Sequence, residues 1–272
     1  MINRKQSKKD TLVFSLAKDF LLNEVENVTA DMINDHIYFK DKDRPKSLSR
    51  LYRRLLESAQ NANMMPGVIK GTIGNVDALS KVLFNFRPRL VYAKYAESYQ
   101  ALLSDINIKL KPKKRIRKGK KSIWVRYANA ILSGAKFMSQ FKNEKDFYRW
   151  VNFFNNDERA REALPLLLDS KIKGMGFALS CDFLKEVGYT KFGKPDVHIK
   201  KIFTRLGLSQ TEDDSVVFNA IERIAQNVKK KPYTVDKLFW LIGSGNFYRN
   251  RDKKKFGRNA DKFIRYAKKR MR

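Results

Sequence analysis

The residues best placed to do chemistry lie between positions 172 and 208 of this 272-residue chain. Asp196 follows Pro195 and directly precedes an apolar-periodic segment, so its carboxylate stands at the start of a predicted helix. There it can cap the helix, which contributes ~1 kcal/mol. A carboxylate in the same place can also stabilise a developing positive charge or activate a water molecule. His198, two residues further on, is a supporting histidine of the helix face or a member of the site.

A Gly-x-Gly turn, formed by Gly174 and Gly176, precedes Asp196 in the same stretch. Two glycines allow a tight turn and a close approach of the backbone to a ligand. The helix predicted over 177–187 begins directly after them, and the N–H groups of its first turn carry partial positive charge that suits a phosphate. Lys171 and Lys173 add to that charge. Taken alone, the turn fits a plain connection between two helices equally well.

The elements that position these residues are helices throughout. Apolar residues recur at helical spacing, and no alternating segment is long enough to predict a strand of any size. We therefore predict an all-α fold. The predicted helices cover 11–26, a segment that begins after Ser47, 76–86, 91–104, 123–140, 144–154, 157–169, 177–187, 197–206, 213–229, 234–242 and 256–270.

Charge is the outstanding feature of the composition. The chain has 58 Lys and Arg residues against 28 Asp and Glu residues, a net charge of +30, while 43% hydrophobic residues suffice for a core. Such an excess attracts nucleic acid. No apolar run reaches the ~18–20 residues of a membrane-spanning helix, and no leader peptide is evident. Cys181 is the single cysteine, which excludes an internal disulfide and a four-cysteine metal cluster within this chain. We expect a cytoplasmic protein, associated with the nucleoid if the source is prokaryotic.

The most basic stretch is 109–121, which has nine Lys or Arg residues in thirteen positions. Pro112 and Gly119 predict a loop or a disordered arm rather than a packed element. It is either a solvated linker or an arm that neutralises phosphates.

The Gly-x-Gly turn with its flanking helices forms a hairpin, and residues 195–198 read Pro-Asp-Val-His. Together these two elements resemble the helix-hairpin-helix superfamily of DNA glycosylases, which includes the endonuclease III-like and 8-oxoguanine glycosylase enzymes. In that superfamily a (Leu/Ile)-x-Gly-x-Gly hairpin precedes a (Val/Pro)-Asp-x-His element by a similar distance. The resemblance implies that Asp196 is the catalytic aspartate. It also implies that DNA phosphates are bound by Lys171, Lys173, Gly174, Gly176 and Ala178.

The same resemblance implies two helical lobes with the active site in the cleft between them. One lobe runs from 44 to 190, includes the basic segment at 109–121 and ends in the helix-hairpin-helix at about 165–187. The other combines 1–43 with 191–272 and carries Asp196.

Further site residues follow from the resemblance. The stretch 59–63 is similar to the turn from which such enzymes insert a polar side chain into the space left by an extruded base, or is an amide-rich helix end. Its candidates are Asn61, with Gln60 and Asn63 as neighbours. Candidates for the base pocket are Phe177, His198, Tyr233 and Trp240.

One departure concerns the reaction. Bifunctional members have a lysine two positions beyond the second hairpin glycine, where this chain has Ala178. The resemblance thus implies a monofunctional, water-using DNA glycosylase that excises a damaged base in repair, or a hypermodified base of viral DNA in defence. We expect a monomer on duplex DNA without metal or cofactor, apart from a K⁺ or Na⁺ ion that the family's hairpin can hold. The alternatives are a non-catalytic helix-hairpin-helix DNA-binding protein and an RNA-binding protein.

Overall fold

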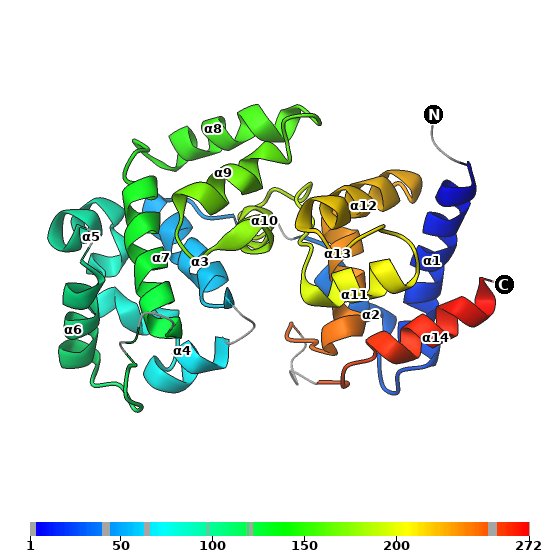
Figure 1. Cartoon of the computed structure of the whole chain (residues 1–272), viewed down its shortest axis with the longest axis horizontal. Coiled ribbons are helices and arrows are strands. Elements are labelled where there is room, and N and C mark those ends of the chain that lie inside the picture. Colours follow the sequence, from blue (N-terminus) through cyan, green and yellow to red (C-terminus); the bar gives the residue numbers. More distant parts are fainter. Residues whose placement is uncertain are drawn as a thin grey trace. The chain divides into compact units, whose positions relative to one another are not determined.

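The protein is all-α, as predicted (Figure 1). Its computed structural model describes residues 4–39, 44–62, 66–96, 98–117, 119, 122–249 and 255–271. Within these ranges the regular elements are all helices, and the only extended pairing is an isolated bridge between Asn246 and Lys255. None of the described helices is long and apolar enough to cross a membrane.

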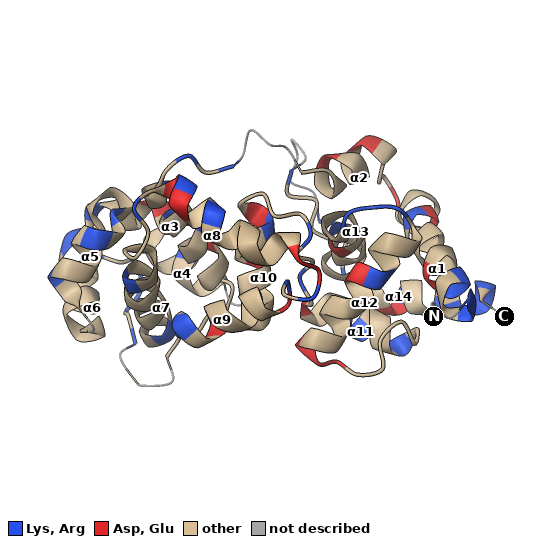
Figure 2. Ribbon diagram, turned by 90° about the horizontal axis from the view of Figure 1, so that it is seen from above, with Lys and Arg blue, Asp and Glu red and all other residues tan. Residues whose placement is uncertain are grey.

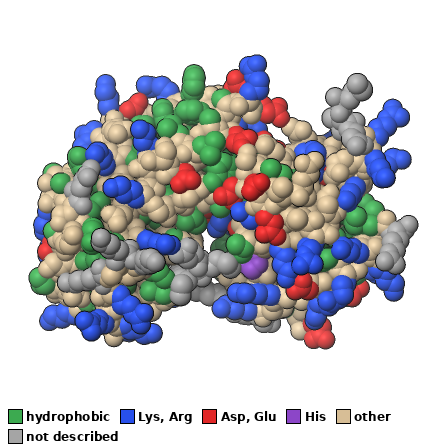
Figure 3. Space-filling model, in the orientation of Figure 1, with side chains coloured by type: hydrophobic (Ala, Val, Ile, Leu, Met, Phe, Trp, Pro, Cys, Tyr) green, Lys and Arg blue, Asp and Glu red, His purple; other side chains and the backbone are tan. Residues whose placement is uncertain are grey.

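The chain forms two compact units. Unit 1 combines Met1–Lys42 with Gly188–Arg272, and unit 2 is continuous over Asp43–Val187. The division predicted from the sequence was 1–43 plus 191–272 and 44–190. Lys and Arg residues occur on helices of both units (Figure 2), and many of their side chains project from the face drawn in Figure 3.

Unit 1 is organised around one buried helix. Its helices are α1 (Arg4–Asn23), α2 (Ala30–Ile37), α11 (Val197–Arg205), α12 (Asp214–Asn227), α13 (Pro232–Ser244) and α14 (Ala260–Arg270). Helix α13 packs against all five others, and its Phe239 ring lies edge-on to Phe203 of α11 and Phe263 of α14, with centroids 5.0 and 6.1 Å away. A helix that is apolar on nearly every side is expected in such a central position.

Unit 2 contains the remaining helices. They are α3 (Leu48–Ala59), α4 (Pro66–Ile73), the 3₁₀ segments η3 (Val76–Lys81) and η4 (Phe84–Phe86), α5 (Pro88–Tyr95), α6 (Tyr99–Leu110), α7 (Ile123–Met138), α8 (Glu144–Asn156), α9 (Ala163–Lys171) and α10 (Gly176–Glu186). Helix α7 is its centre and packs against α3, α5, α6 and α9. Ser47 and Ser122 cap α3 and α7, since each side chain accepts a backbone N–H bond from the first turn.

Several local predictions need correction. The helix predicted over 76–86 is two 3₁₀ segments, because Phe84, Asn85 and Phe86 have positive φ angles. The helix predicted over 91–104 is interrupted at Ala96, whose φ is 45°. Helices α2 and α4 were not predicted.

The basic segment also differs from its prediction. Residues 109 and 110 belong to α6, and the described residues beyond them are irregular but packed. Ile116 is 4% exposed, and the Lys113 N–H donates to the Thr72 carbonyl of α4 over 3.0 Å. Buried Ile116 and the Lys113 backbone bond therefore hold this segment against the rest of unit 2 despite its positive charge. Lys118, Lys120 and Lys121 lie outside the described residues.

Candidate functional site

Asp196 is the N-cap of α11 in unit 1. Its backbone is extended (φ −84°, ψ 171°), and its Oδ1 accepts the N–H bonds of His198 and Ile199 over 3.0 and 3.1 Å. The side chain is half-buried, and Oδ2 accepts no hydrogen bond from the part of the chain that the structure describes. One oxygen therefore fixes the carboxylate while the other is left for a ligand or water.

A close helix crossing supports this carboxylate. A Cβ atom at Gly243 of α13 would lie 2.4 Å from the Cβ of His198, so only glycine allows α11 and α13 to approach this closely. On the other side of Asp196, the Lys194 N–H donates to Oδ2 of the buried Asp236 of α13 over 3.1 Å. Contacts with α13 thus hold the polypeptide on both sides of Asp196.

His198 is a neutral member of this group. Burial lowers the pKa of its imidazole, the carboxylate of Asp196 opposes that effect, and the cations Arg258, Lys194 and Lys201 add to the lowering. Because the ordinary pKa of histidine is already about 6.5, the ring is uncharged at neutral pH. His198 is therefore suited to supporting the loop rather than to donating a proton.

The predicted hairpin lies in unit 2, between α9 and α10. Gly174 and Gly176 have φ angles of +80° and +66°, which side chains rarely adopt, and Ile172 anchors the turn in the core. The Met175 N–H donates to the Ile172 carbonyl over 3.2 Å, which closes the turn. Both glycines are therefore required by the backbone itself.

The hairpin is held on α7. The Lys173 N–H donates to Oγ of Ser133 over 3.0 Å, and a Cβ atom at Gly174 would lie 3.5 Å from the Arg126 carbonyl oxygen. Met175, the residue before α10, makes no side-chain cap to that helix. The first turn of α10, with Lys171 and Lys173 exposed nearby, can therefore receive an anion. Ala178 lies in this first turn and is half-buried.

The amide-rich stretch follows α3 in the same unit. Gln60 is the C-cap of α3, and Nδ2 of Asn61 donates to the Glu57 carbonyl over 3.3 Å. Both side chains are half-buried, and Asn63 lies outside the described residues. Just before them, Oγ of Ser58 donates to Oδ2 of Asp182 over 2.8 Å, a buried bond that ties the end of α3 to α10. Asn61 and the hairpin helix are thus parts of one framework.

The base-pocket candidates are dispersed. Phe177 is a core residue of unit 2, with 4% of its surface exposed, and His198 lies against Gly243 in unit 1. Tyr233 and Trp240, in contrast, are brought together on α13 around the ammonium of Lys237, which lies 5.6 and 5.5 Å from their ring centroids.

Tyr233, Lys237, Trp240 and Tyr248 together form an aromatic cluster around one ammonium group. Lys237 and Tyr248 were not predicted from the sequence. Lys237 is only 5% exposed, and its Nζ donates to the Tyr248 hydroxyl over 3.1 Å. The Tyr248 ring in turn lies edge-on to His36, with centroids 5.0 Å apart. Positions 233, 237 and 240 are spaced as one helix face, which is a signal for Lys237, whereas Tyr248 enters from beyond the helix.

Comparisons with known proteins give a fold. No family model matches the chain, and neither does any curated protein sequence. Among solved structures it is similar to the crystal structure of the Methanocaldococcus jannaschii 8-oxoguanine glycosylase/lyase in complex with a 15mer DNA containing 8-oxoguanine. The TM-score is 0.52 at 16% sequence identity, over 90% of this chain and 100% of that one. The two chains share an all-α fold.

Among the described residues, no three His, Cys, Asp or Glu side chains are grouped as metal ligands. The predicted K⁺ or Na⁺ ion in the hairpin and the predicted cleft between the lobes stay predictions.

Proposed function

We propose that this protein is a DNA glycosylase that hydrolyses the N-glycosidic bond of a damaged or modified base. The observation that carries the proposal is the state of Asp196: Oδ1 is fixed by two backbone N–H bonds while Oδ2 is not engaged by the described residues. The fold shared with a glycosylase/lyase that was crystallised on 8-oxoguanine DNA supports it.

Asp196 acts on the sugar in this proposal. The target nucleotide is first flipped out of the duplex, at a cost of a few kcal/mol. As the glycosidic bond breaks, positive charge develops on the deoxyribose, and a nearby carboxylate stabilises that charge. The Asp196 carboxylate also orients or deprotonates the attacking water, as a carboxylate does in glycoside hydrolases. His198 keeps its neutral ring beside the carboxylate.

The hairpin supplies affinity rather than chemistry. Its amides and the exposed Lys171 and Lys173 bind phosphates, so binding falls as salt rises. Asn61, with Gln60 and Asn63 as its neighbours, fills the gap left by the extruded base. The partly exposed rings of Trp240 and Tyr248 offer a stacking surface for a base.

We propose a monofunctional reaction, although the similar structure is of a glycosylase/lyase. A Schiff base with the sugar needs a lysine amine, and Ala178 has none at the hairpin position. Water is therefore the nucleophile, and the product is an intact strand with an abasic site. The enzyme acts as a monomer in the cytoplasm or on the nucleoid.

A second function is favoured by the capping itself. Because Asp196 accepts two N–H bonds at the start of α11, it has a structural role without any catalysis. A non-catalytic DNA-binding protein with the same fold would need no more than this, and would bind DNA without releasing a base.

The test is mass spectrometry of the free bases released from a panel of duplex DNAs. The panel contains oxidised, alkylated and deaminated bases and naturally hypermodified viral DNA. Wild-type protein should release one base, and Asp196→Asn should release it about 10²–10⁴-fold more slowly. Asn also caps helices, so this variant should keep its fold. A damaged substrate base would indicate repair and a hypermodified one defence.

The matched control is Asp213→Asn, at the start of α12 in the same unit, where the side chain caps nothing and bonds Thr211 instead. It should release the base at the wild-type rate. Tight duplex binding with no base released across the panel would favour the non-catalytic protein, and preference for RNA over duplex DNA at matched salt an RNA-binding one.

A further inference from the structure

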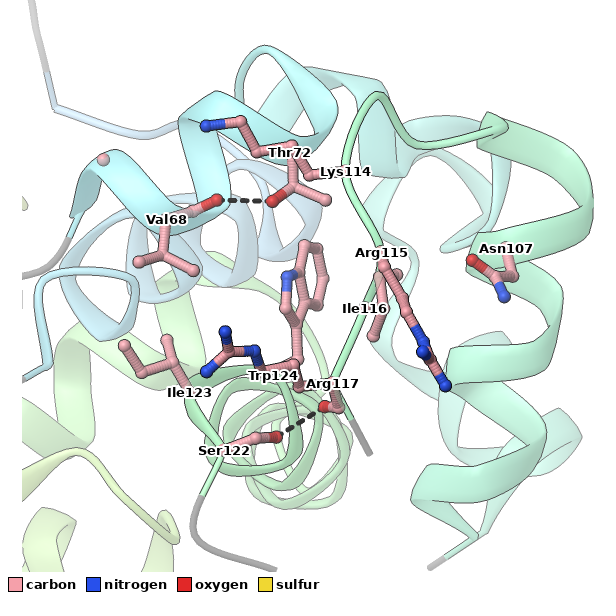
Figure 4. A pocket seen from close by; sticks show the side chains of 11 residues that line it. Val68, Thr72, Asn107, Lys114, Arg115, Ile116, Arg117, Ser122, Ile123 and Trp124 are labelled. Carbon is pink, nitrogen blue, oxygen red and sulfur yellow. Dashed lines mark hydrogen bonds between the residues drawn. The ribbon is translucent and has the colours of Figure 1, made fainter. Parts of the chain in front are cut away.

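Unit 2 contains a cavity of about 1290 Å³ that the proposed reaction does not use (Figure 4). Its walls are α4, the irregular segment before α7, and the first residues of α7, with Asn107 of α6 at one side. It is larger than the ~300–1,000 Å³ of an ordinary small-molecule site, and so has room for part of a larger molecule.

Hydrogen bonds hold the walls of the cavity in place. Oγ of Ser122 donates to the Arg117 carbonyl over 2.6 Å, which ties the irregular segment to the start of α7. The Lys113 N–H bond to Thr72 ties the same segment to α4. Buried Ile116 fixes the stretch between these two bonds.

Trp124 gives the cavity an unused donor. The residue is 3% exposed, and its indole Nε1 is buried with no hydrogen-bond acceptor among the described residues. An indole N–H can only donate, and a buried donor without an acceptor is unfavourable. In Figure 4 the nitrogen is on the side of the ring that faces Val68 and Ile123, both of which line the cavity. An entering acceptor would satisfy it.

The charge of the lining selects an anion. Lys114, Arg115 and Arg117 line the cavity, and none of the described lining residues is acidic. Nζ of Lys114 lies over α4, 3.9 Å from where a Cβ of Gly71 would be. In the view of Figure 4 the charged ends of Lys114 and Arg117 lie on the same side of the indole as its nitrogen, whereas Arg115 extends toward α6.

We propose that this cavity binds a phosphorylated nucleoside unit. Lys114 and Arg117 bind the phosphate, and the Trp124 N–H donates to an acceptor on the base or sugar. The inference rests on the proposed function only in naming a DNA strand as the source; a free nucleotide offers the same groups.

The position of the cavity favours the strand. Helix α7 carries both the cavity and the hairpin, since Trp124 lies two residues before Arg126, against which Gly174 packs. A strand held at the hairpin therefore has a second site on the same helix.

The test uses the full-length protein in equilibrium binding at several salt concentrations. The probes are a fluorescent duplex, its single strand, and thymidine 5′-monophosphate. The variants are the double substitution Lys114→Gln/Arg117→Gln and, separately, Trp124→Phe, which keeps an aromatic ring but has no N–H. Lys145→Gln/Arg149→Gln removes two exposed cations of α8 that do not line the cavity, and is the charge-matched control. Thermal unfolding checks that Trp124→Phe is folded.

The double variant should lower the salt slope of duplex binding by about 0.9 for each phosphate that is no longer neutralised. Trp124→Phe should weaken binding about 3- to 10-fold without changing the slope, because it removes a neutral hydrogen bond. Lys145→Gln/Arg149→Gln should bind as wild type does. Weaker binding confined to the two oligonucleotides identifies a DNA strand as the ligand, whereas parallel weakening for the mononucleotide identifies a free nucleotide.

Two results would overturn the proposal. One is wild-type binding of all three probes by every cavity variant. The other is a lowered slope in the double variant with no effect of Trp124→Phe, which would mean a basic surface and no pocket. These binding measurements are independent of base release. If no base is released but the cavity variants weaken binding as expected, the glycosylase is refuted and the cavity site is not. If a base is released but the cavity variants bind as wild type does, the cavity site is refuted and the glycosylase is not.

Discussion

Helix α11 begins with Asp196, whose Oδ1 accepts two backbone N–H bonds, whereas α10 begins after Met175, whose side chain caps nothing. Asp196 supplies a negative charge to the start of α11. The start of α10 has no such group among the described residues and can bind an anion of a ligand. This difference separates the two roles: a carboxylate held in place is suited to chemistry, and an uncapped helix start beside exposed lysines is suited to binding phosphate.

The largest effect should come from Asp196. Asp196→Asn should slow base release about 10²–10⁴-fold, because the amide cannot stabilise a developing cation or activate water. Duplex affinity should be unchanged or tighter. Asp196→Ala should be equally inactive but also lose about 1 kcal/mol of stability, since alanine cannot cap α11. Single-turnover kinetics and urea unfolding measure the two effects, and equal stabilities of the Asn and Ala variants would contradict the capping role.

The lysines of the hairpin should affect binding alone. Lys171→Gln/Lys173→Gln should weaken duplex affinity about tenfold and reduce the salt slope by about 0.9 for each phosphate left without a cation, for every sequence alike. Fluorescence anisotropy across a salt series measures this. Lys145→Gln, an exposed lysine of α8, is the control. A decrease in affinity that depends on DNA sequence would mean that the lysines bind bases.

The hairpin glycines should affect stability more modestly. Gly174→Ala and Gly176→Ala should each destabilise unit 2 by about 1–2 kcal/mol, because both positions have positive φ. Gly67→Ala in α4, where a Cβ meets no atom within 4 Å and no positive φ occurs, should be neutral or stabilising. Denaturant unfolding distinguishes them. Equal behaviour of the three variants would show that the hairpin turn is not strained by a side chain.

The smallest effect is on pH dependence. Burial lowers the pKa of His198 and also of His36, so the unfolded chain binds more protons than the folded one as pH falls. The associated stability is present above the unfolded histidine pKa of about 6.5 and is lost as pH falls through it toward the lowered folded values. His198→Gln should flatten that part of a stability–pH profile. A profile that falls equally in the variant would contradict the burial of the imidazole.

The sequence predicted what depends on local pattern. Helical periodicity, the helix start after Ser47 and the paired hairpin glycines are properties of short segments, and the all-α class is confirmed by the structure. The aromatic cluster around Lys237 and the cavity at Trp124 could not be predicted, because their side chains come from segments that only folding brings together. Positive φ angles at Phe84 and Ala96 broke predicted helices, since neither residue type signals such a conformation.

The most direct test compares the two helix starts in one single-turnover assay, on the duplex whose base the wild type releases. At subsaturating protein, both Asp196→Asn and Lys171→Gln/Lys173→Gln should be slow. At saturating protein the lysine variant should recover the wild-type rate, while Asp196→Asn should stay about 10²–10⁴-fold slower, because saturation corrects binding and not chemistry. Wild-type turnover by saturating Asp196→Asn would contradict the assignment of chemistry to the start of α11.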